Sequence, residues 1–122
     1  MATIYHIANA ADWEQATTDG TYTTSTKGRT LEEQGFIHAT QSAPQTNKVA
    51  NSFYKDAGEP LIVLVISTDK LTSPFRYDDV PGWNEAFPHI YGPLNPDAVV
   101  DVVPLVPGPD GEFTFTPPAT PG

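Results

Sequence analysis

The clearest hydrophobic pattern in the chain is the unbroken run of branched apolar residues Leu61–Ser67. A run of this kind predicts a strand that is buried on both faces and lies at the centre of a sheet. Residues with high strand propensity predict further strands at Thr3–Ala8 and Phe36–Ala39, a short extended piece at Tyr22–Ser25, and an edge strand at Phe75–Val80.

Two longer segments carry helical patterns. Ala10–Ala16 follows Asn9, whose side-chain oxygen suits a helix N-cap. Gln45–Lys55 places apolar residues at helical spacing, so that Val49 and Phe53 are expected on its buried face, with Ala50 and Tyr54 as further candidates. A single helical turn is expected at Thr30–Gln34, before a glycine that would end it.

The C-terminal part of the chain predicts a closing hairpin. Val99–Val106 and Glu112–Thr116 would form its arms, and Pro104 indicates that the first arm lies at an edge. Residues 117–122 are rich in proline and are expected to be a disordered tail. The order of elements predicts one α+β domain over residues 1–116, with two main helices and a mixed, mainly antiparallel sheet.

Charge and composition narrow the classes of partner. The net charge is -9, from 15 acidic and 6 scattered basic residues, which argues against binding nucleic acid. The longest apolar run is far too short to span a bilayer, and no signal peptide is visible at the N-terminus. We therefore expect a cytoplasmic protein without a membrane partner, whereas its oligomeric state is not predicted.

All three histidines lie in aromatic and apolar phrases, Ile4–Ile7, Gly35–Thr40 and Phe87–Leu94. Histidine titrates near neutral pH and is the side chain most often used to protonate or bind a ligand. His6, His38 and His89 are therefore candidate catalytic residues that share one cleft. The alternative is that each is a hydrogen-bonded histidine within a strand. A zinc site is not favoured, because no two histidines have helical spacing.

Five further residues are candidates for binding the ligand of such a cleft. Tyr22, Trp83 and Tyr91 could stack on a ring, and the hydroxyl groups of Ser25 and Thr40 could add hydrogen bonds. The alternative for the hydroxyl groups is a role in loops and helix caps. A nucleotide or a sugar-like small molecule would suit this combination of imidazole, aromatic and hydroxyl groups.

The chain resembles a family of bacterial proteins, the domain of unknown function DUF952. The phrases that carry the resemblance are Ile4–Ile7, Gly35–Gln41, Ala50–Tyr54 and the long, unusual Phe87–Leu94, with Asp110–Phe113 at the end. The family is grouped with folds similar to ADP-ribosyltransferases and RNA 2′-phosphotransferases. The resemblance therefore implies an ADP-ribosyltransferase-like split sheet.

The same resemblance suggests NAD or ADP-ribose as the ligand, with His6 as the first-strand histidine that bonds a ribose hydroxyl. Two departures are visible. Ile7 follows His6 where NAD-clamping enzymes usually have glycine, and no late glutamate has an obvious place. Two hypotheses remain, a ribosyl transferase or hydrolase and a catalytically inactive binding module of the same fold. We expect NAD hydrolysis to be weak or absent, and we expect His6→Asn to weaken ligand binding without unfolding the protein.

Overall fold

The computed structural model describes residues 2–26, 29–55, 58 and 60–117. Its strands are β1 (Thr3–Asn9), β2 (Thr24–Thr26), β3 (Arg29–Thr30), β4 (Ile37–His38), β5 (Leu61–Ser67), β6 (Phe75–Asp79), β7 (Ala86–Ile90) and β8 (Val99–Leu105). Its helices are α1 (Ala10–Asp19), α2 (Leu31–Gln34) and α3 (Ala43–Phe53), with short 3₁₀ turns at Thr68–Lys70 and Pro96–Ala98. Within the described residues no helix has the length and apolar character needed to cross a membrane. The expected disordered tail lies, from residue 118 onward, outside the described residues.

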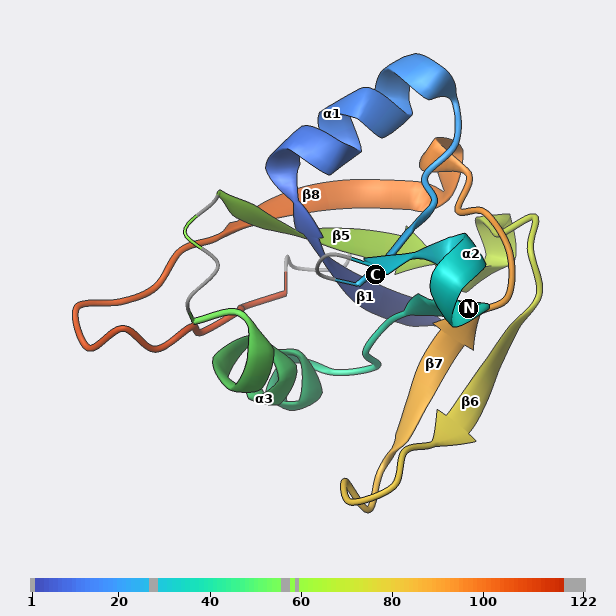
Figure 1. The fold of residues 1–122 in the computed structure, drawn as a ribbon. Helices are drawn as coiled ribbons and strands as arrows, with labels where there is room; N and C mark the ends of the chain where they lie inside the picture. The colour runs from blue at the N-terminus through green and yellow to red at the C-terminus, as the bar shows by residue number, and fades with distance from the viewer. Residues whose placement is uncertain (1, 27–28, 56–57, 59, 118–122) are drawn as a thin grey trace.

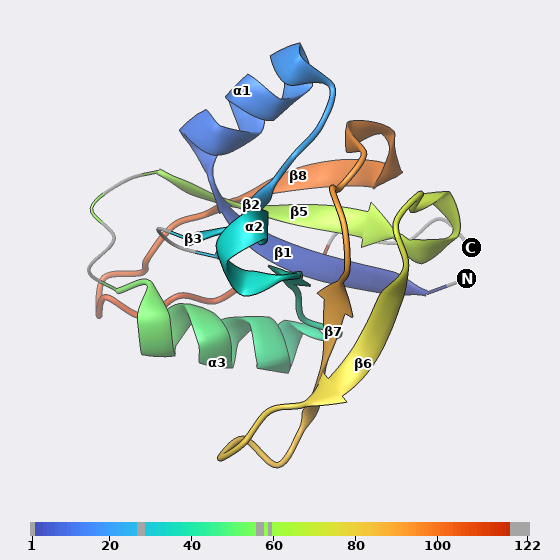
Figure 2. The same ribbon diagram turned by 45° about the vertical axis from the view of Figure 1, so that its right-hand side comes forward.

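Two three-stranded antiparallel sheets organise the fold, in the orders β1-β5-β8 and β4-β7-β6. The first sheet has β5 at its centre, which confirms the prediction for the apolar run. The second forms a hairpin of β6 and β7 that extends away from the first sheet (Figures 1 and 2). The α+β class and the single small domain are confirmed, and β6 is the predicted edge strand.

Strand β7 has no counterpart in the sequence analysis. Pro88 lies within it, and proline argues against a central strand because it lacks a backbone donor. The structure tolerates Pro88 here because β4 pairs with β7 only through Ile37 and His38. The Pro88 carbonyl instead accepts a hydrogen bond from the backbone of Ala39, at 3.0 Å.

Helices α1 and α3 cover opposite faces of the β1-β5-β8 sheet (Figure 1). Alternation along β5 sends Leu64 to the core on the α1 side and Val63 to the core on the α3 side. Helix α3 begins two residues earlier than predicted, because the Ser42 side chain caps it by accepting a hydrogen bond from the Gln45 backbone. The prediction that Phe53 is buried is wrong: it is 60% exposed, and Tyr54 is buried in its place.

The predicted C-terminal hairpin is not formed. Among the described residues the second arm bonds to the expected loop rather than to the first arm, through the isolated bridge of Phe113 to Pro107 and the bond from the Gly108 backbone to the Glu112 carbonyl. The arm instead lies along α3, where Asn51 accepts a hydrogen bond from the Phe113 backbone at 2.7 Å and donates one to its carbonyl at 3.1 Å. Asn47 accepts one from the Phe115 backbone. Both phenylalanines are thereby held in the core on the α3 side.

We predict that Asn51→Ala lowers the free energy of unfolding by roughly 1–3 kcal/mol, because two partly buried backbone groups of Phe113 lose their partner. Chemical denaturation measures the effect. Ser52→Ala, on the exposed neighbouring position of α3, is the control and should change stability by less than about 0.5 kcal/mol. Equal effects of the two substitutions would show that the hydrogen bonds of Asn51 to the Phe113 backbone do not stabilise the fold.

Candidate functional site

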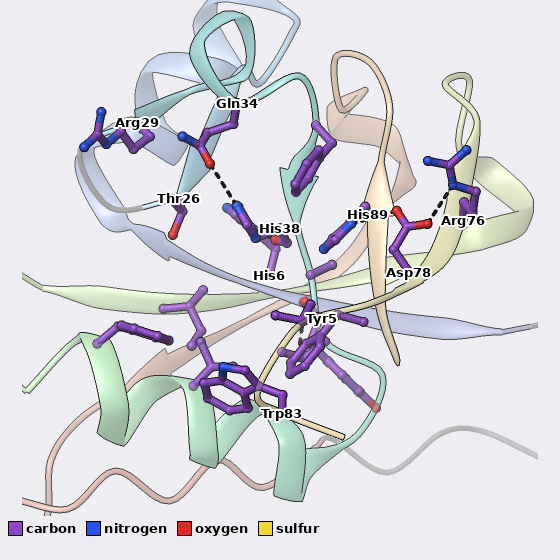
Figure 3. A pocket seen from close by; sticks show the side chains of 18 of the residues that line it. Tyr5, His6, Thr26, Arg29, Gln34, His38, Arg76, Asp78, Trp83 and His89 are labelled. Carbon is purple, nitrogen blue, oxygen red and sulfur yellow. Dashed lines mark hydrogen bonds and ion pairs between the residues drawn. The ribbon is translucent and has the colours of Figure 1, made fainter. Parts of the chain in front are cut away.

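One cavity of about 1010 Å³ lies where β1 meets β4, α3 and the β6–β7 hairpin. His6, His38 and His89 line one side of it (Figure 3). Trp83 lies across the cavity from them in this view, and Tyr5, Phe53 and Phe87 also line the cavity. The three histidines that the sequence analysis singled out therefore all line one cavity.

Backbone pairing explains this convergence. His38 of β4 pairs directly with His89 of β7, and their rings meet edge to face with centroids 5.4 Å apart. An isolated bridge between Tyr5 and Thr40 attaches the end of β4 to the free edge of β1. Since His6 neighbours Tyr5, the three imidazoles come together from strands that are far apart in sequence.

His6 is committed to internal hydrogen bonds. Its Nδ1 donates to the carbonyl of His38, and its Nε2 lies 2.9 Å from the Tyr22 hydroxyl. A carbonyl can only accept, so Nδ1 carries the proton and the neutral ring accepts from Tyr22 through Nε2. Burial lowers the pKa of His6 to about 4, against the opposing effect of the bond to His38. These bonds favour the structural interpretation of His6 over a catalytic one.

His38 lies beside the cavity with a freer ring. Its Nε2 is 3.4 Å from Gln34 Oε1, a long contact, and its ring meets Phe36 edge on with centroids 4.7 Å apart. Burial, and then repulsion from His89 when that ring is charged, lower the pKa of His38 to about 4. His38 is therefore neutral at physiological pH and can exchange hydrogen bonds with an uncharged ligand.

His89 combines a fixed ring with an unused nitrogen. Its Nδ1 donates to Asp78 Oδ2 at 2.9 Å, and Phe36 stacks on the ring with centroids 4.0 Å apart. The residue is 5% exposed, and its buried Nε2 has no hydrogen-bond partner among the described residues. A buried acceptor without a partner costs roughly 1–3 kcal/mol, which indicates that something else supplies the donor.

Asp78 is held by three donors. Arg76 Nε donates to Oδ1 at 2.7 Å, and the Tyr91 hydroxyl and His89 Nδ1 both donate to Oδ2. Arg76 Nη2 in turn donates to the Tyr91 hydroxyl at 2.8 Å. The hydrogen bond from Tyr91, with smaller effects of His89 and Arg76, lowers the pKa of Asp78 to about 2. The carboxylate is therefore ionised at any physiological pH.

Sequence analysis missed both Arg76 and Asp78. The signal was present in the predicted edge strand, because residues two apart on a strand share a face. Their partner was not visible, since β7 was not expected, and so nothing connected Asp78 with His89. The register confirms the shared face: Arg76 pairs with His89, and Asp78 with Phe87.

The five expected ligand-binding residues divide into two groups. Trp83 and Tyr91 line the cavity, and Thr40 does so as well, although its hydroxyl bonds Thr46 at 2.6 Å. Tyr22 and Ser25 do not line it. Both are fully buried. The Tyr22 hydroxyl bonds His6, and the Ser25 hydroxyl donates to the carbonyl of Phe36. Their hydroxyl groups hold the fold around the cavity.

Trp83 is positioned by an anchored loop. The Ala86 carbonyl, just beyond it, accepts hydrogen bonds from the side chains of Gln41 at 2.8 Å and Gln45 at 3.1 Å. Lys48 and Glu85 add an ion pair of 2.6 Å between α3 and the loop. The Trp83 ring thus lies 5.9 Å from that of Phe53, centroid to centroid, with the two ring planes tilted by 30°, and both rings line the cavity.

The described residues contain no group of three or more histidine, aspartate or glutamate side chains placed to hold a metal ion. The lining of the cavity contains several polar side chains. They include His38, His89, Gln34 and Thr26, whose hydroxyl lies 3.2 Å from that of Tyr54, and Arg29, whose ion pair with Glu33 is 3.8 Å long.

Comparison with known proteins identifies the family. The family model described as "Protein of unknown function (DUF952)" matches residues 7–102. The chain is also similar to the protein CC0527 from Caulobacter crescentus. Its crystal structure has a TM-score of 0.77 and 25% identity, over 93% of this chain and 94% of that chain. Its solution NMR structure gives 0.73 and 26%, over 92% and 91%. No curated protein matches the chain.

The depressed pKa of His6 predicts a pH dependence of stability. The ordinary pKa of 6.5 holds in the unfolded chain and a value of about 4 in the folded one. Between these values only the unfolded chain binds the proton, so stability is full above about pH 6.5 and falls as the pH drops toward 4. His6→Asn should remove this loss, which amounts to roughly 3 kcal/mol for a pKa change of that size, as measured by urea unfolding at several pH values.

The same substitution should also cost roughly 1–3 kcal/mol at pH 7, because the bonds to His38 and Tyr22 are lost. A variant with wild-type stability at pH 7 and an unchanged pH slope would show that His6 does not hold the fold.

Proposed function

We propose that this chain, which belongs to the DUF952 family, binds a nucleotide- or sugar-like small molecule in the histidine-lined cavity. The observation that carries the proposal is the convergence of three imidazoles on a cavity that also has an aromatic surface. Small-molecule sites are mostly apolar, with a few convergent polar groups that fix the orientation of the ligand.

The polar side of the cavity suits a ligand rich in hydroxyl groups. His38 is neutral and His89 has an unused nitrogen, so each can exchange a hydrogen bond with a sugar hydroxyl. Arg29 is largely exposed, and its long ion pair with Glu33 costs little to exchange for a phosphate group. These groups support a ligand rich in hydroxyl groups, and Arg29 can bind a phosphate group where the ligand carries one.

The apolar side suits a flat ring. Trp83 and Phe53 present neighbouring aromatic faces, and stacking on such faces is tolerant of the identity of the base. The resemblance to ADP-ribosyltransferase-like folds adds NAD and ADP-ribose to the ligands to be tested.

Binding without ribosyl transfer is favoured by His6. Its two nitrogens are both used inside the protein, so it has no free group for a ribose hydroxyl. Ile7, in place of a glycine, also narrows the approach to the backbone at this point. Binding without ribosyl transfer is therefore preferred to the transferase, and NAD hydrolysis is expected to be weak or absent.

The test is an NMR titration of the imidazole Cε1–H signals with adenosine, AMP, ADP-ribose and NAD. The His38 and His89 signals should shift with at least one of these compounds at millimolar concentration, whereas the enclosed His6 should respond less. If no histidine signal moves with any of them, nucleotide binding is the wrong function.

We further predict that Trp83→Ala weakens the binding of adenosine by about 5- to 150-fold, which corresponds to the ~1–3 kcal/mol of one base stacked on an aromatic ring. Isothermal titration calorimetry gives the affinity. Tyr77→Ala is the matched control, because Tyr77 is an exposed aromatic residue of the same hairpin that does not line the cavity. Equal losses in the two variants would argue against stacking on Trp83.

A further inference from the structure

The unused nitrogen of His89 has the geometry of a base. Because Nδ1 donates to Asp78, the lone pair of the neutral ring lies on Nε2. The ring lines the cavity and is fixed between the stacked Phe36 and the edge of His38 (Figure 3). A hydrogen-bond donor that enters the cavity and reaches Nε2 would give this buried atom the partner that it lacks among the described residues.

Asp78 gives this base its orientation and its counter-charge. The carboxylate is held by Arg76 and Tyr91, so it cannot turn away from the imidazole. A carboxylate in this position fixes the tautomer of the histidine and stabilises the imidazolium that forms when Nε2 takes a proton. The side chains of Asp78 and His89 take no part in the pairing of β6 with β7, which runs through the backbone.

The lining of the cavity indicates both the nucleophile and the substrate. None of the described lining residues is a serine or a cysteine, and the hydroxyl groups of Thr26 and Thr40 bond those of Tyr54 and Thr46, so water is the available nucleophile. The charged lining residues are two arginines and two aspartates, which balance. An uncharged electrophile with an apolar part fits this surface better than an ionic one.

We propose that Asp78 and His89 form a general-base dyad that activates water to hydrolyse an uncharged carboxylic ester of a sugar or nucleoside alcohol. His89 is the catalytic residue and Asp78 a positioning residue. This inference rests on the proposed binding function, because the ester must occupy the same cavity.

The step is balanced without a co-reactant. Water gives a proton to His89 Nε2, and its oxygen bonds to the carbonyl carbon. The bond from that carbon to the alcohol oxygen then breaks, and the imidazolium returns the proton to the departing oxygen. The products are a carboxylic acid and an alcohol, and His89 is again neutral.

The experiment measures the hydrolysis of 5′-O-acetyladenosine by chromatography and of p-nitrophenyl acetate by absorbance. His89→Gln should lower kcat by about 10²- to 10⁴-fold, the usual contribution of a general base. Asp78→Asn should lower kcat with little change in KM, because it keeps a hydrogen-bond acceptor and removes only the charge. Asp101→Asn, an exposed aspartate of β8, is the matched control and should retain wild-type activity.

Binding of adenosine, followed by NMR in the same variants, separates the two proposals. Adenosine binding without hydrolysis of either ester, or with equal activity in wild type and His89→Gln, overturns the dyad and leaves the binding function intact. If adenosine and the other nucleotides do not bind, the binding function fails, and p-nitrophenyl acetate alone then decides for or against the dyad. Thermal melting checks the fold of each variant, and Asp78→Asn decides the matter if His89→Gln does not fold.

Discussion

The hydrogen bond from His6 to the carbonyl of His38 joins the two three-stranded sheets of this fold beside the cavity. It holds β4 against the edge of β1, where the bridge between Tyr5 and Thr40 reinforces it. Because His38 pairs with His89 across β4 and β7, the position of the whole second sheet follows from this attachment. The same imidazole that looks most like a ligand-binding group in the sequence therefore acts as a structural link.

The apolar run Leu61–Ser67 and the capped start of α1 could be predicted from the sequence because local composition decides them. Other features depend on distant partners. Phe53 follows a helical pattern yet lies beside the cavity, while Tyr54 takes its place in the core. The second arm of the expected hairpin pairs with asparagines of α3, because the amide of Asn51 both donates and accepts as a neighbouring strand would.

The candidate site could also be predicted only in part, because local sequence reveals the residues but not their distant partners. The three histidine phrases were conspicuous in the sequence, and the structure brings all three to one cavity. Their different environments could not be inferred, because each depends on a residue of another segment of the chain: Tyr22 for His6, Gln34 for His38 and Asp78 for His89. Chemical identity alone made them equivalent, whereas hydrogen bonding makes one structural, one neutral and exchangeable, and one oriented with a nitrogen to spare.

The C-terminal segment held by α3 also bears on where this structural unit ends. The family match stops at residue 102, yet Phe115 meets the ring of Tyr5 edge on, with centroids 5.1 Å apart, and Tyr5 lines the cavity. A fragment that ends at residue 102 would keep every histidine but lose Phe115, which packs against the cavity-lining residue Tyr5. The shortest piece suitable for expression and ligand screening therefore extends through Phe115.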